Sequence, residues 1–351
     1  MKRTRPVRYV HIGRTTFVKK DIEILQSEFD VREHFFRVSP KLSVVTSLLH
    51  QFFWLLWHGS NTGVFVCQFA GYHSLLPGLF GKALGIPVII VASGTESAKY
   101  PSISYGNFSK LFFGFFTAQS FKLASHVVVV HKSLAKSQNT YYSTDGKAQG
   151  FLNHVDNLDV EITEIPYGFD FNRWVPVADR RPNSFITVAH VWNRVRFVLK
   201  GIDLMLDLAD AFPDCEFTII GMTYTPDRPI PGNVNVFAAV DNDQLAAVYS
   251  AHQFYVQLSI SEGHPNALCE AMLCGCIPIG STAGAIPDII GETGYFVSHR
   301  DLDEAKDTLA AAISDKRSDL SEQARNRVKT LFPLGRRRSE LNKLVAGYLT
   351  R

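Results

Sequence analysis

The chain has 351 residues, of which 46% are hydrophobic and 20% are charged. This length and composition exclude a disordered or fibrous protein and provide enough apolar residues for two globular domains. The basic start runs directly into a strand without a long apolar region behind it, so we expect no signal peptide.

The cysteines are predicted to be buried thiols. Their odd number offers no disulfide framework, and three of them lie on one predicted helix and its exit rather than at the spacing of a zinc site. Buried thiols in a reducing compartment are therefore favoured over metal ligands. The residues are Cys67, Cys215, Cys269, Cys274 and Cys276.

Charge is distributed unevenly along the chain, although the net charge is only +3. Residues 1–155 contain 17 Lys and Arg against 7 Asp and Glu, whereas residues 156–351 contain 19 against 26. The basic first half predicts attraction to an anionic partner, such as a membrane surface or a lipid-diphosphate acceptor. No zinc finger, ribonucleoprotein motif or basic helix-turn-helix accompanies the charge, so we expect no nucleic acid.

The first predicted strand covers residues 7–12 and ends at a loop that contains Gly13. A helix over residues 19–29 follows. In open parallel sheets, ligands collect beyond the carboxyl ends of the strands, so Gly13 would face a cleft and let a ligand approach closely. An ordinary strand-to-helix turn is the alternative.

Two apolar segments of the first half, residues 42–57 and 111–116, are rich in aromatic side chains. The longer segment is predicted to be a helix, but it is too short for a membrane span, which takes about 20 residues. Packing in the core is favoured, and contact with a membrane interface is the alternative.

Residues 64–69 and 87–92 are continuous apolar runs, as expected of buried parallel strands. His73 lies shortly after the first run, and Thr95 and Glu96 lie in the polar loop after the second. Because both loops follow the carboxyl ends of strands, these side chains are candidates for binding an acceptor. A structural role is the alternative, since a lone histidine is more often structural than catalytic.

A further strand is predicted over residues 126–130, and a looser stretch follows around residues 140–157. The Pro-Gly turn within residues 165–170 marks a domain boundary. The first domain is therefore expected to cover residues 1–165 and the second domain residues 166–335.

Strands and helices alternate throughout the second half, which predicts a doubly wound parallel sheet. Its first strand, residues 185–189, leads into a basic loop over residues 191–203 that contains Arg194, Arg196 and Lys200.

The most informative segment covers residues 259–296. Glu262 stands in a loop after a predicted strand, Pro265 can open a helix because its missing N–H costs nothing there, and Glu270 follows two turns later. The amino terminus of such a helix offers unpaired N–H groups and the positive end of the helix dipole to a phosphate or diphosphate. Both carboxylates could therefore reach one ligand that lies along the helix.

This segment resembles the Glu-x7-Glu signature of the family 4 retaining glycosyltransferases. The match includes the Glu-Gly before Pro265, the Glu-Ala-Met after it, the next Gly-x-Ile-Pro strand, and the Gly-x-Ile-Pro-Asp turn at residues 284–288. Residues 165–170 and 191–203 resemble the linker and the diphosphate-binding loop of the same family. The alternative is an unrelated strand-loop-helix with two solvated carboxylates.

The resemblance implies the GT-B fold, with two Rossmann-like doubly wound parallel-sheet domains facing an interdomain cleft and a final helix, residues 336–351, that crosses back to the first domain. It implies a retaining, metal-independent transfer from a nucleoside-diphosphate sugar to a hydroxyl of a glycan, a lipid-linked or a polysaccharide-precursor acceptor. No cofactor is expected besides this substrate. The implied location is cytoplasmic, with peripheral attachment to the inner face of a membrane as an extension of it.

The resemblance also implies roles for single residues. Lys200 would contact the diphosphate, with Arg194 as the second cation and Arg196 as its substitute, while Glu262 would bind sugar hydroxyls and Glu270 the ribose. The donor site would further include Gly263, His264, Pro265, Asn266 and Ala267, and near the base Gly221 and Met222. In the first domain, Gly94-Thr95-Glu96 replaces the His-Asp pair of many relatives, so the histidine of that pair is not carried over.

Two other functions stay open. A sugar-nucleotide epimerase shares the GT-B fold but would not need the Lys-Gly and Glu-x7-Glu motifs together. A non-catalytic carbohydrate-binding or membrane-binding protein could keep the fold without turnover.

Overall fold

The computed structural model describes residues 5–39 and 43–350. The chain divides into two compact units. Unit 1 consists of the residues up to Ser137, of Gln149–Tyr167 and of the residues from Gly335 onward, and unit 2 consists of Gln138–Ala148 and Gly168–Leu334. Each unit contains a six-stranded sheet in which all neighbouring strands are parallel, which confirms the predicted fold class.

The sheet of unit 1 has the strand order β2-β1-β3-β4-β5-β8. Its central strands β1, β3, β4 and β5 are buried along their whole length, as expected of apolar runs covered on both faces. The strands are β1 (Val7–His11), β2 (Val31–Phe35), β3 (Val64–Gln68), β4 (Val88–Ala92), β5 (His126–Val129) and β8 (Glu161–Glu164).

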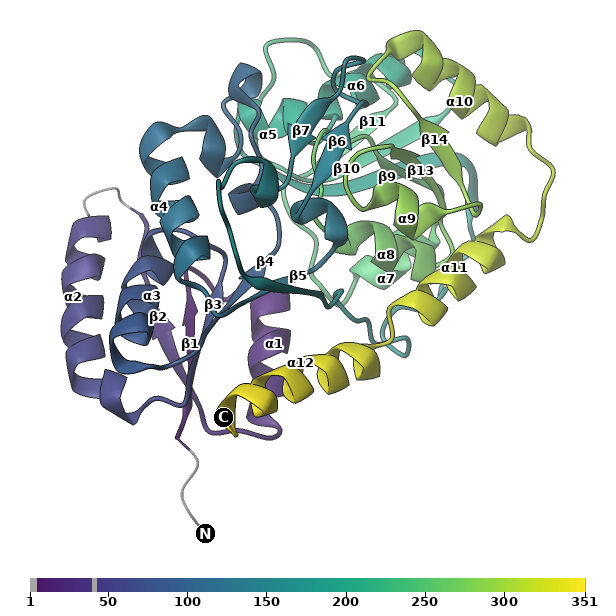
Figure 1. Cartoon of the computed structure of the whole chain (residues 1–351). Coiled ribbons are helices and arrows are strands. Elements are labelled where there is room, and N and C mark those ends of the chain that lie inside the picture. Colours follow the sequence, from purple (N-terminus) through teal and green to yellow (C-terminus); the bar gives the residue numbers. More distant parts are fainter. Residues whose placement is uncertain (1–4, 40–42, 351) are drawn as a thin grey trace. The chain divides into compact units, whose positions relative to one another are not determined.

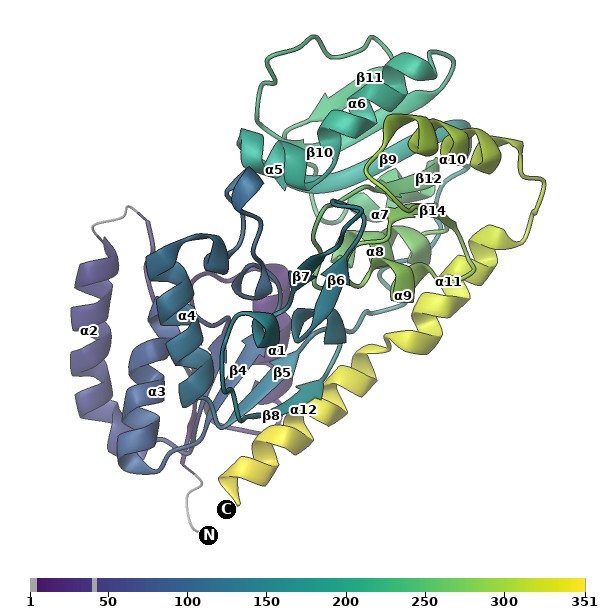
Figure 2. The same ribbon diagram turned by 45° about the horizontal axis from the view of Figure 1, so that its top comes forward.

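Helices cover both faces of this sheet. Right-handed crossovers place the helices that follow β2, β3 and β4 on one face, and Figures 1 and 2 show α2, α3 and α4 side by side there. Helices α1 and α12 lie on the other face. The helices are α1 (Thr16–Gln26), α2 (Ser43–His58), α3 (Tyr72–Leu84), α4 (Leu111–Leu123) and α12 (Leu334–Leu349).

A buried ion pair attaches the last helix to unit 1. The guanidinium of Arg337 on α12 donates to both carboxylate oxygens of Asp21 on α1, at 2.7 and 2.6 Å, and both side chains are almost fully buried. Arg337 also donates to the carbonyl of Ile165 at 2.6 Å and stacks on the ring of Tyr167. A charge this deeply buried is tolerated because each of the three guanidinium nitrogens donates to the Asp21 carboxylate or to a backbone carbonyl.

The sheet of unit 2 has the order β11-β10-β9-β12-β13-β14. The strands are β9 (Arg181–Val191), β10 (Glu216–Met222), β11 (Val234–Phe237), β12 (His252–Gln257), β13 (Ile277–Ser281) and β14 (Tyr295–Val297). The helices are α5 (Arg194–Leu199), α6 (Ile202–Ala211), α7 (Leu245–Ser250), α8 (Asn266–Leu273), α9 (Ile286–Ile290), α10 (Leu302–Ser314) and α11 (Leu320–Leu331). The buried face of α8 packs in the main core of this unit with Tyr249, Tyr255 and Ile286.

The stretch expected to be loose contains a short hairpin. Strands β6 (Ser137–Asn139) and β7 (Lys147–Gln149) pair with each other, and residues 138–148 belong to unit 2. Asn139 donates to the carbonyl of Ile260 at 2.6 Å, and the hydroxyl of Tyr141 donates to the carbonyl of Leu258 at 3.2 Å. These bonds fasten the hairpin to the segment that follows β12.

The prediction that the two aromatic segments pack in the core is wrong for much of their surface. Trp57 on α2 is 83% exposed and Phe53 is 65% exposed, while Leu111 on α4 is 87% exposed. Core packing holds only for the inner sides of the helices, where Leu55 and Phe121 are buried. Within the described residues, no helix is both long and apolar enough to cross a membrane. The five cysteines are buried and free, as predicted.

Candidate active site

An ion pair between Lys200 and Glu262 lies in unit 2. Lys200 ends helix α5, and Glu262 stands in the loop between β12 and α8. The Lys200 ammonium lies 2.5 Å from a Glu262 oxygen, which also accepts a hydrogen bond of 3.0 Å from Gln257, the last residue of β12. The two charged side chains are only 19% and 11% exposed. A cation and a carboxylate that meet in this sheltered position can each bind a polar ligand in exchange for part of the pair.

Two glycines allow the chain segments of this pair to approach closely. Gly201 has φ +68°, and a Cβ there would lie 2.2 Å from the carbonyl oxygen of Leu258. Gly284 has φ +60°, and a Cβ there would lie 1.9 Å from the carbonyl oxygen of Glu262 itself. A larger residue at either position would therefore push Lys200 or Glu262 away from its partner. The amide of Ile260, which donates to Leu199 at 2.8 Å, ties the two segments together.

Glu270 lies on α8, eight residues after Glu262 in the sequence, and it is half-buried. Tyr255 on β12 lies within electrostatic range of both carboxylates. Burial raises the pKa of Tyr255 above its usual value, and the charges of Glu262 and Glu270 raise this pKa further. Both carboxylates of the Glu-x7-Glu motif thus act electrostatically on one neutral tyrosine, whose hydroxyl donates to Gln257 at 3.2 Å.

Helix α8 begins at Asn266, and Pro265 is its N-cap residue. Gly263, His264 and Pro265 are buried, and the His264 ring packs edge to face with Phe332 at 4.8 Å. Asn266 and Ala267 are half-buried, and the Asn266 Oδ1 atom has no hydrogen-bond partner in the described part of the chain. The first amides of any helix have no carbonyl group one turn before them to which they could donate. The amino end of α8 can therefore bind an anion.

The two arginines before Lys200 occupy different sides of α5. Arg196 precedes Lys200 by one helical turn, with the Lys200 amide donating to the Arg196 carbonyl, so the two side chains share a face. The Arg196 guanidinium lies over the Trp192 ring at 4.7 Å. Arg194 precedes Lys200 by six residues, is strongly exposed, and forms an ion pair with Asp227 at 3.7 Å. The helical phase therefore brings Arg196, rather than Arg194, to the side of Lys200.

Gly221 and Met222 lie at the carboxyl end of β10, where the base of a nucleotide was expected. Gly221 has φ +92°, and a Cβ there would lie 2.4 Å from the carbonyl oxygen of Ala189. Met222 is buried. The amides of the next two residues both donate to the Val191 carbonyl, which fixes this loop against the start of the basic loop.

Two of the unit 1 residues that are candidates for binding the acceptor substrate, His73 and Glu96, form hydrogen bonds with backbone groups near them in the sequence. His73 at the start of α3 bonds the Gln68 carbonyl at 2.6 Å, and burial lowers its pKa to about 4, so the ring is neutral. Glu96 accepts the amides of Ser93 and Gly94, and burial raises its pKa to about 7. Acceptor binding by these residues stays a prediction.

The other two candidates of unit 1 are less enclosed. The hydroxyl of Thr95 lies 3.3 Å from that of Tyr105, and the side chain is half-buried. Gly13 is also half-buried, and a Cβ built on it would meet nothing within 4 Å. The space beside Gly13 is therefore compatible with a ligand, although the glycine itself is not required by its neighbours.

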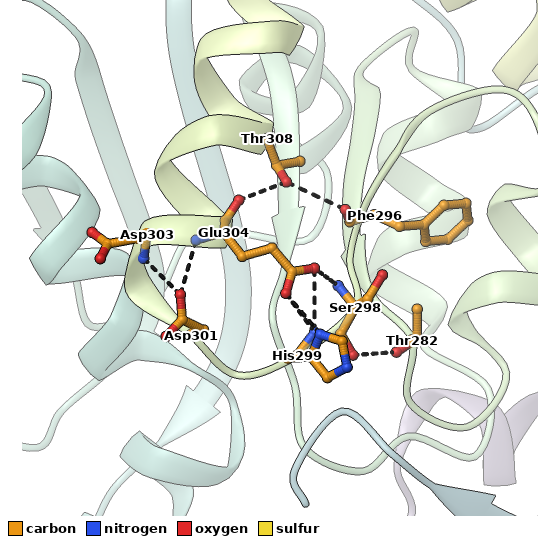
Figure 3. Close-up of polar contacts among 8 residues, drawn as sticks. All are labelled: Thr282, Phe296, Ser298, His299, Asp301, Asp303, Glu304 and Thr308. Atoms are coloured by element: carbon orange, nitrogen blue, oxygen red, sulfur yellow. Dashed lines mark hydrogen bonds and ion pairs between the residues drawn. The ribbon is translucent and has the colours of Figure 1, made fainter. Parts of the chain in front are cut away.

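The start of α10 is fixed by its own side chains, as Figure 3 shows. Asp301 accepts the amides of Asp303 and Glu304, both at 3.0 Å, and Glu304 reaches back to the amides of Ser298 and His299. Partial burial opposes ionisation, but these bonds hold the pKa of Glu304 below its usual value.

The next residue of this loop, Arg300, donates its amide to Tyr141 of the hairpin at 2.8 Å and pairs with Asp203. The loop therefore connects the α10 cap to the hairpin. Although Asp301-Leu302-Asp303 is one of two Asp-x-Asp triplets in the sequence, no group of three or more His, Cys, Asp or Glu within residues 5–39 and 43–350 could hold a metal ion.

Sequence reasoning missed Gln257, Tyr255 and Trp192. Each gives a faint signal. Gln257 is a polar residue directly after the apolar run Phe254-Tyr255-Val256 of its strand, and Tyr255 lies two residues before it on the same side. Trp192 is an exposed aromatic residue in a basic loop, a combination that suits stacking under an arginine.

Comparison with protein families gives a match within unit 2. Residues 175–327 match the family described as glycosyl transferases group 1. The chain is 21% identical over 180 residues to a component of the phosphatidylinositol N-acetylglucosaminyltransferase of Arabidopsis thaliana, covering 48% of this chain and 40% of that protein. It is 28% identical over 128 residues to the sulfoquinovosyl transferase SQD2 of the same plant, covering 34% and 25%. The chain thus matches less than half the length of these curated relatives.

The similarity to solved structures extends over the whole chain. A sucrose-phosphate synthase from Thermosynechococcus elongatus superposes with a TM-score of 0.74 at 16% identity, covering 99% of both chains. HepE from Anabaena in complex with UDP-glucose superposes with a TM-score of 0.70 at 12% identity, covering 98% of this chain and 99% of that one. The chain therefore has the GT-B fold, and residues 175–327 in its second unit match glycosyl transferases group 1.

Proposed function

We propose that this protein is a retaining glycosyltransferase that moves a sugar from a nucleoside-diphosphate sugar to a hydroxyl acceptor. The observation that carries the proposal is the sheltered Lys200–Glu262 pair beside the amino end of α8, inside the segment that matches glycosyl transferases group 1. HepE, a protein of the same fold, binds UDP-glucose. A nucleoside-diphosphate sugar carries both an anion and hydroxyls, which suits a site that offers both a cation and a carboxylate.

In this proposal, unit 2 holds the donor. Lys200 contacts the diphosphate together with the first amides of α8, and Arg196 supplies the second cation in preference to Arg194, because Arg196 shares a helical face with Lys200. These positive groups stabilise the charge that develops on the leaving diphosphate without a divalent metal. Glu270 binds the ribose hydroxyls.

When the donor enters, Lys200 shifts part of its interaction from Glu262 to phosphate oxygens. Glu262 then accepts hydrogen bonds from sugar hydroxyls near the reacting carbon, while Gln257 keeps its carboxylate oriented. The acceptor hydroxyl attacks from the face that the diphosphate leaves, and the leaving phosphate oxygen takes up its proton. The configuration at the anomeric carbon is retained.

The acceptor is proposed to be a glycan or a lipid-linked precursor bound by unit 1. The excess of Lys and Arg over Asp and Glu in residues 1–155 favours an anionic acceptor. Within that unit, the open space beside Gly13 and the half-buried Thr95 are better placed to contact a ligand than His73 and Glu96, whose polar atoms bond their own backbone.

The test begins with binding. UDP, GDP and ADP, each alone and as sugar conjugates, are compared for their effect on the melting temperature, because a ligand at 100 times its Kd stabilises the native state by about 2.7 kcal/mol. One base is expected to stabilise the protein, and Lys200→Ala is expected to lose this effect, whereas the surface variant Lys306→Ala keeps it.

Turnover is then followed by NMR with the stabilising donor and hydroxyl acceptors in the presence of a chelator. The expected product keeps the anomeric configuration of the donor. Inversion of configuration would overturn the retaining assignment. Epimerised donor without any acceptor would indicate an epimerase, and failure to bind any nucleoside diphosphate would indicate a non-catalytic protein.

A further inference from the structure

The outer faces of α2 and α4 form an apolar surface on unit 1. On α2, Val45, Leu49, Phe52, Phe53, Leu56 and Trp57 are exposed. On α4, Leu111, Phe112, Phe113 and Phe115 are exposed. Helix α3 packs between the two, with Phe80 against Phe52 and Tyr72 against Phe113, so the exposed residues belong to one layer of helices. We call the exposed residues of α2 and α4 the apolar face.

Helix α2 differs from an ordinary surface helix, because its outer side is apolar as well as its inner side. Its buried side includes Gln51, whose amide donates to the His73 carbonyl at 2.9 Å, while Trp57 and Phe53 point outward. A soluble domain normally places such aromatic residues inside and polar residues outside. The apolar side chains of this face are therefore not explained by folding of the described chain, and they indicate a partner.

The exposed charges in the sequence stretch that contains the apolar face have one sign. Between Glu33 and Asp145 the sequence contains a single acidic residue, Glu96, and that residue is buried. The same stretch contains eight Lys and Arg. Among them, Lys110 is the N-cap residue of α4, with its ammonium over the Phe113 ring, and Lys122 lies in the last turn of α4. Lys82 lies in the last turn of α3.

We propose that the apolar face binds peripherally to an anionic lipid bilayer. Its aromatic and aliphatic side chains would enter the boundary between headgroups and acyl chains, and its lysines would contact the anionic headgroups. Charge complementarity favours this occupant over a second copy of the chain. In a twofold dimer the face would meet itself, and no exposed acidic residue of this stretch could pair with its lysines.

Peripheral binding also agrees with the lengths of the helices. In the described chain, no helix could span a bilayer, so α2 and α4 would lie along the interface. The proposal does not depend on glycosyl transfer, because it concerns the outer surface of unit 1 and not the residues of unit 2. If both proposals hold, the membrane would supply a lipid-linked acceptor to unit 1.

The test is flotation of the full-length protein with vesicles, without nucleotide. Vesicles of phosphatidylcholine are compared with vesicles that also contain about 30 mol% phosphatidylglycerol. Phosphatidylglycerol is the anionic probe, and it gives the vesicles a negative surface like that of a cell membrane. We expect binding to the anionic vesicles that weakens with added salt, because headgroup attraction is screened within about 8 Å at physiological ionic strength.

Two sets of variants locate the surface. The triple variant F53S/L56S/W57S removes outward side chains of α2 and is expected to lower vesicle partitioning about a thousandfold, at about tenfold per apolar residue. The double variant K110E/K122E is expected to lower it at least tenfold, since each lysine near an anionic surface contributes about fivefold. The matched controls in unit 2, V177S/I230S and Lys316→Glu, also change exposed residues and should bind like the wild type.

Circular dichroism melting verifies that the variants fold, which is expected because all substituted side chains point outward. The proposal is overturned if the wild type does not float with anionic vesicles, or if the variants of α2 and α4 bind as the controls do. It is also overturned if the triple variant changes the oligomeric state in light scattering and leaves vesicle binding unchanged, because the face would then bind a second copy.

Discussion

Helices α10 and α11 in unit 2 and helices α2 and α4 in unit 1 cover sheets of the same architecture, but they present opposite surfaces. The exposed sides of α10 and α11 carry charged residues, such as Asp303, Lys306 and Glu322. The exposed sides of α2 and α4 carry Phe, Trp and Leu. The fold therefore does not dictate the exterior. The outer helices of unit 2 carry charged side chains, whereas the apolar face of unit 1 is the basis of the proposed membrane binding.

The loops at the carboxyl ends of the strands differ in a similar way. In unit 2, Lys200 and Glu262 satisfy each other side chain to side chain. In unit 1, His73 and Glu96 satisfy backbone groups of their own loops. A side chain paired with another side chain can exchange that partner for a ligand at low cost. One that holds its own loop together cannot do so without disturbing the fold.

The largest expected effect tests this difference directly. Lys200→Ala and Glu262→Ala should each lower kcat/KM by about a thousandfold, since removal of one preorganised group at a developing charge costs about a hundredfold to a thousandfold in rate. The melting temperature should change little. Steady-state assays measure the effect, with Lys306→Ala as the control charge on α10. Near-full turnover of either variant with the true donor would refute the assignment of this pair.

The second prediction compares the stability of the two units. Arg337→Met leaves Asp21 buried without its cation, which typically costs about 3–5 kcal/mol. The loss should appear as faster hydrogen exchange in unit 1, while peptides of unit 2 are much less affected. Arg336→Met is the matched control, because Arg336 forms an exposed pair with Glu340 one turn away and should contribute below about 1 kcal/mol. Equal exchange changes for the two variants would argue against the anchoring role of Arg337.

The third prediction concerns pH and again separates the units. Burial lowers the pKa of His34 and His73 to about 4, so the unfolded chain binds more protons than the folded chain between about pH 6.5 and 4. Unit 1 should therefore lose stability as the pH falls through this range, by on the order of 3 kcal/mol per histidine. Glu96 acts in the opposite direction, because its raised pKa of about 7 stabilises unit 1 at low pH.

The measurement is hydrogen exchange of both units at a series of pH values. His34→Gln should make the loss in unit 1 less steep, and exposed His299→Gln in unit 2 should not. If unit 2 loses stability first on acidification, these buried histidines do not set the acid limit of the protein.

The sequence was sufficient to predict the parallel sheets, because alternating strands are a local pattern. Motif spacing singled out Lys200 and Glu262, which the structure brings together, and their roles stay a prediction. It could not choose between Arg194 and Arg196, since α5 was read as part of a loop and no helical phase was assigned. It favoured the wrong environment for Phe53 and Trp57, because an all-apolar helix does not reveal which side faces its neighbours. The bonds from Asn139 and Tyr141 to the segment after β12 join residues more than one hundred positions apart, beyond any local pattern.

The smallest expected effect concerns the capped start of α10. Asp301→Ala removes the acceptor of two amides and should cost about 1 kcal/mol, the usual value of a side-chain cap. Asp319→Ala is the control within the same unit, because Asp319 occupies the N-cap of α11 without a side-chain cap bond and should matter by less than about 0.5 kcal/mol. Hydrogen exchange of the first turn of each helix measures both effects. The neighbouring Arg300 holds Tyr141, so exchange in the hairpin should also rise in Asp301→Ala; an unchanged hairpin would show that the cap stabilises α10 alone.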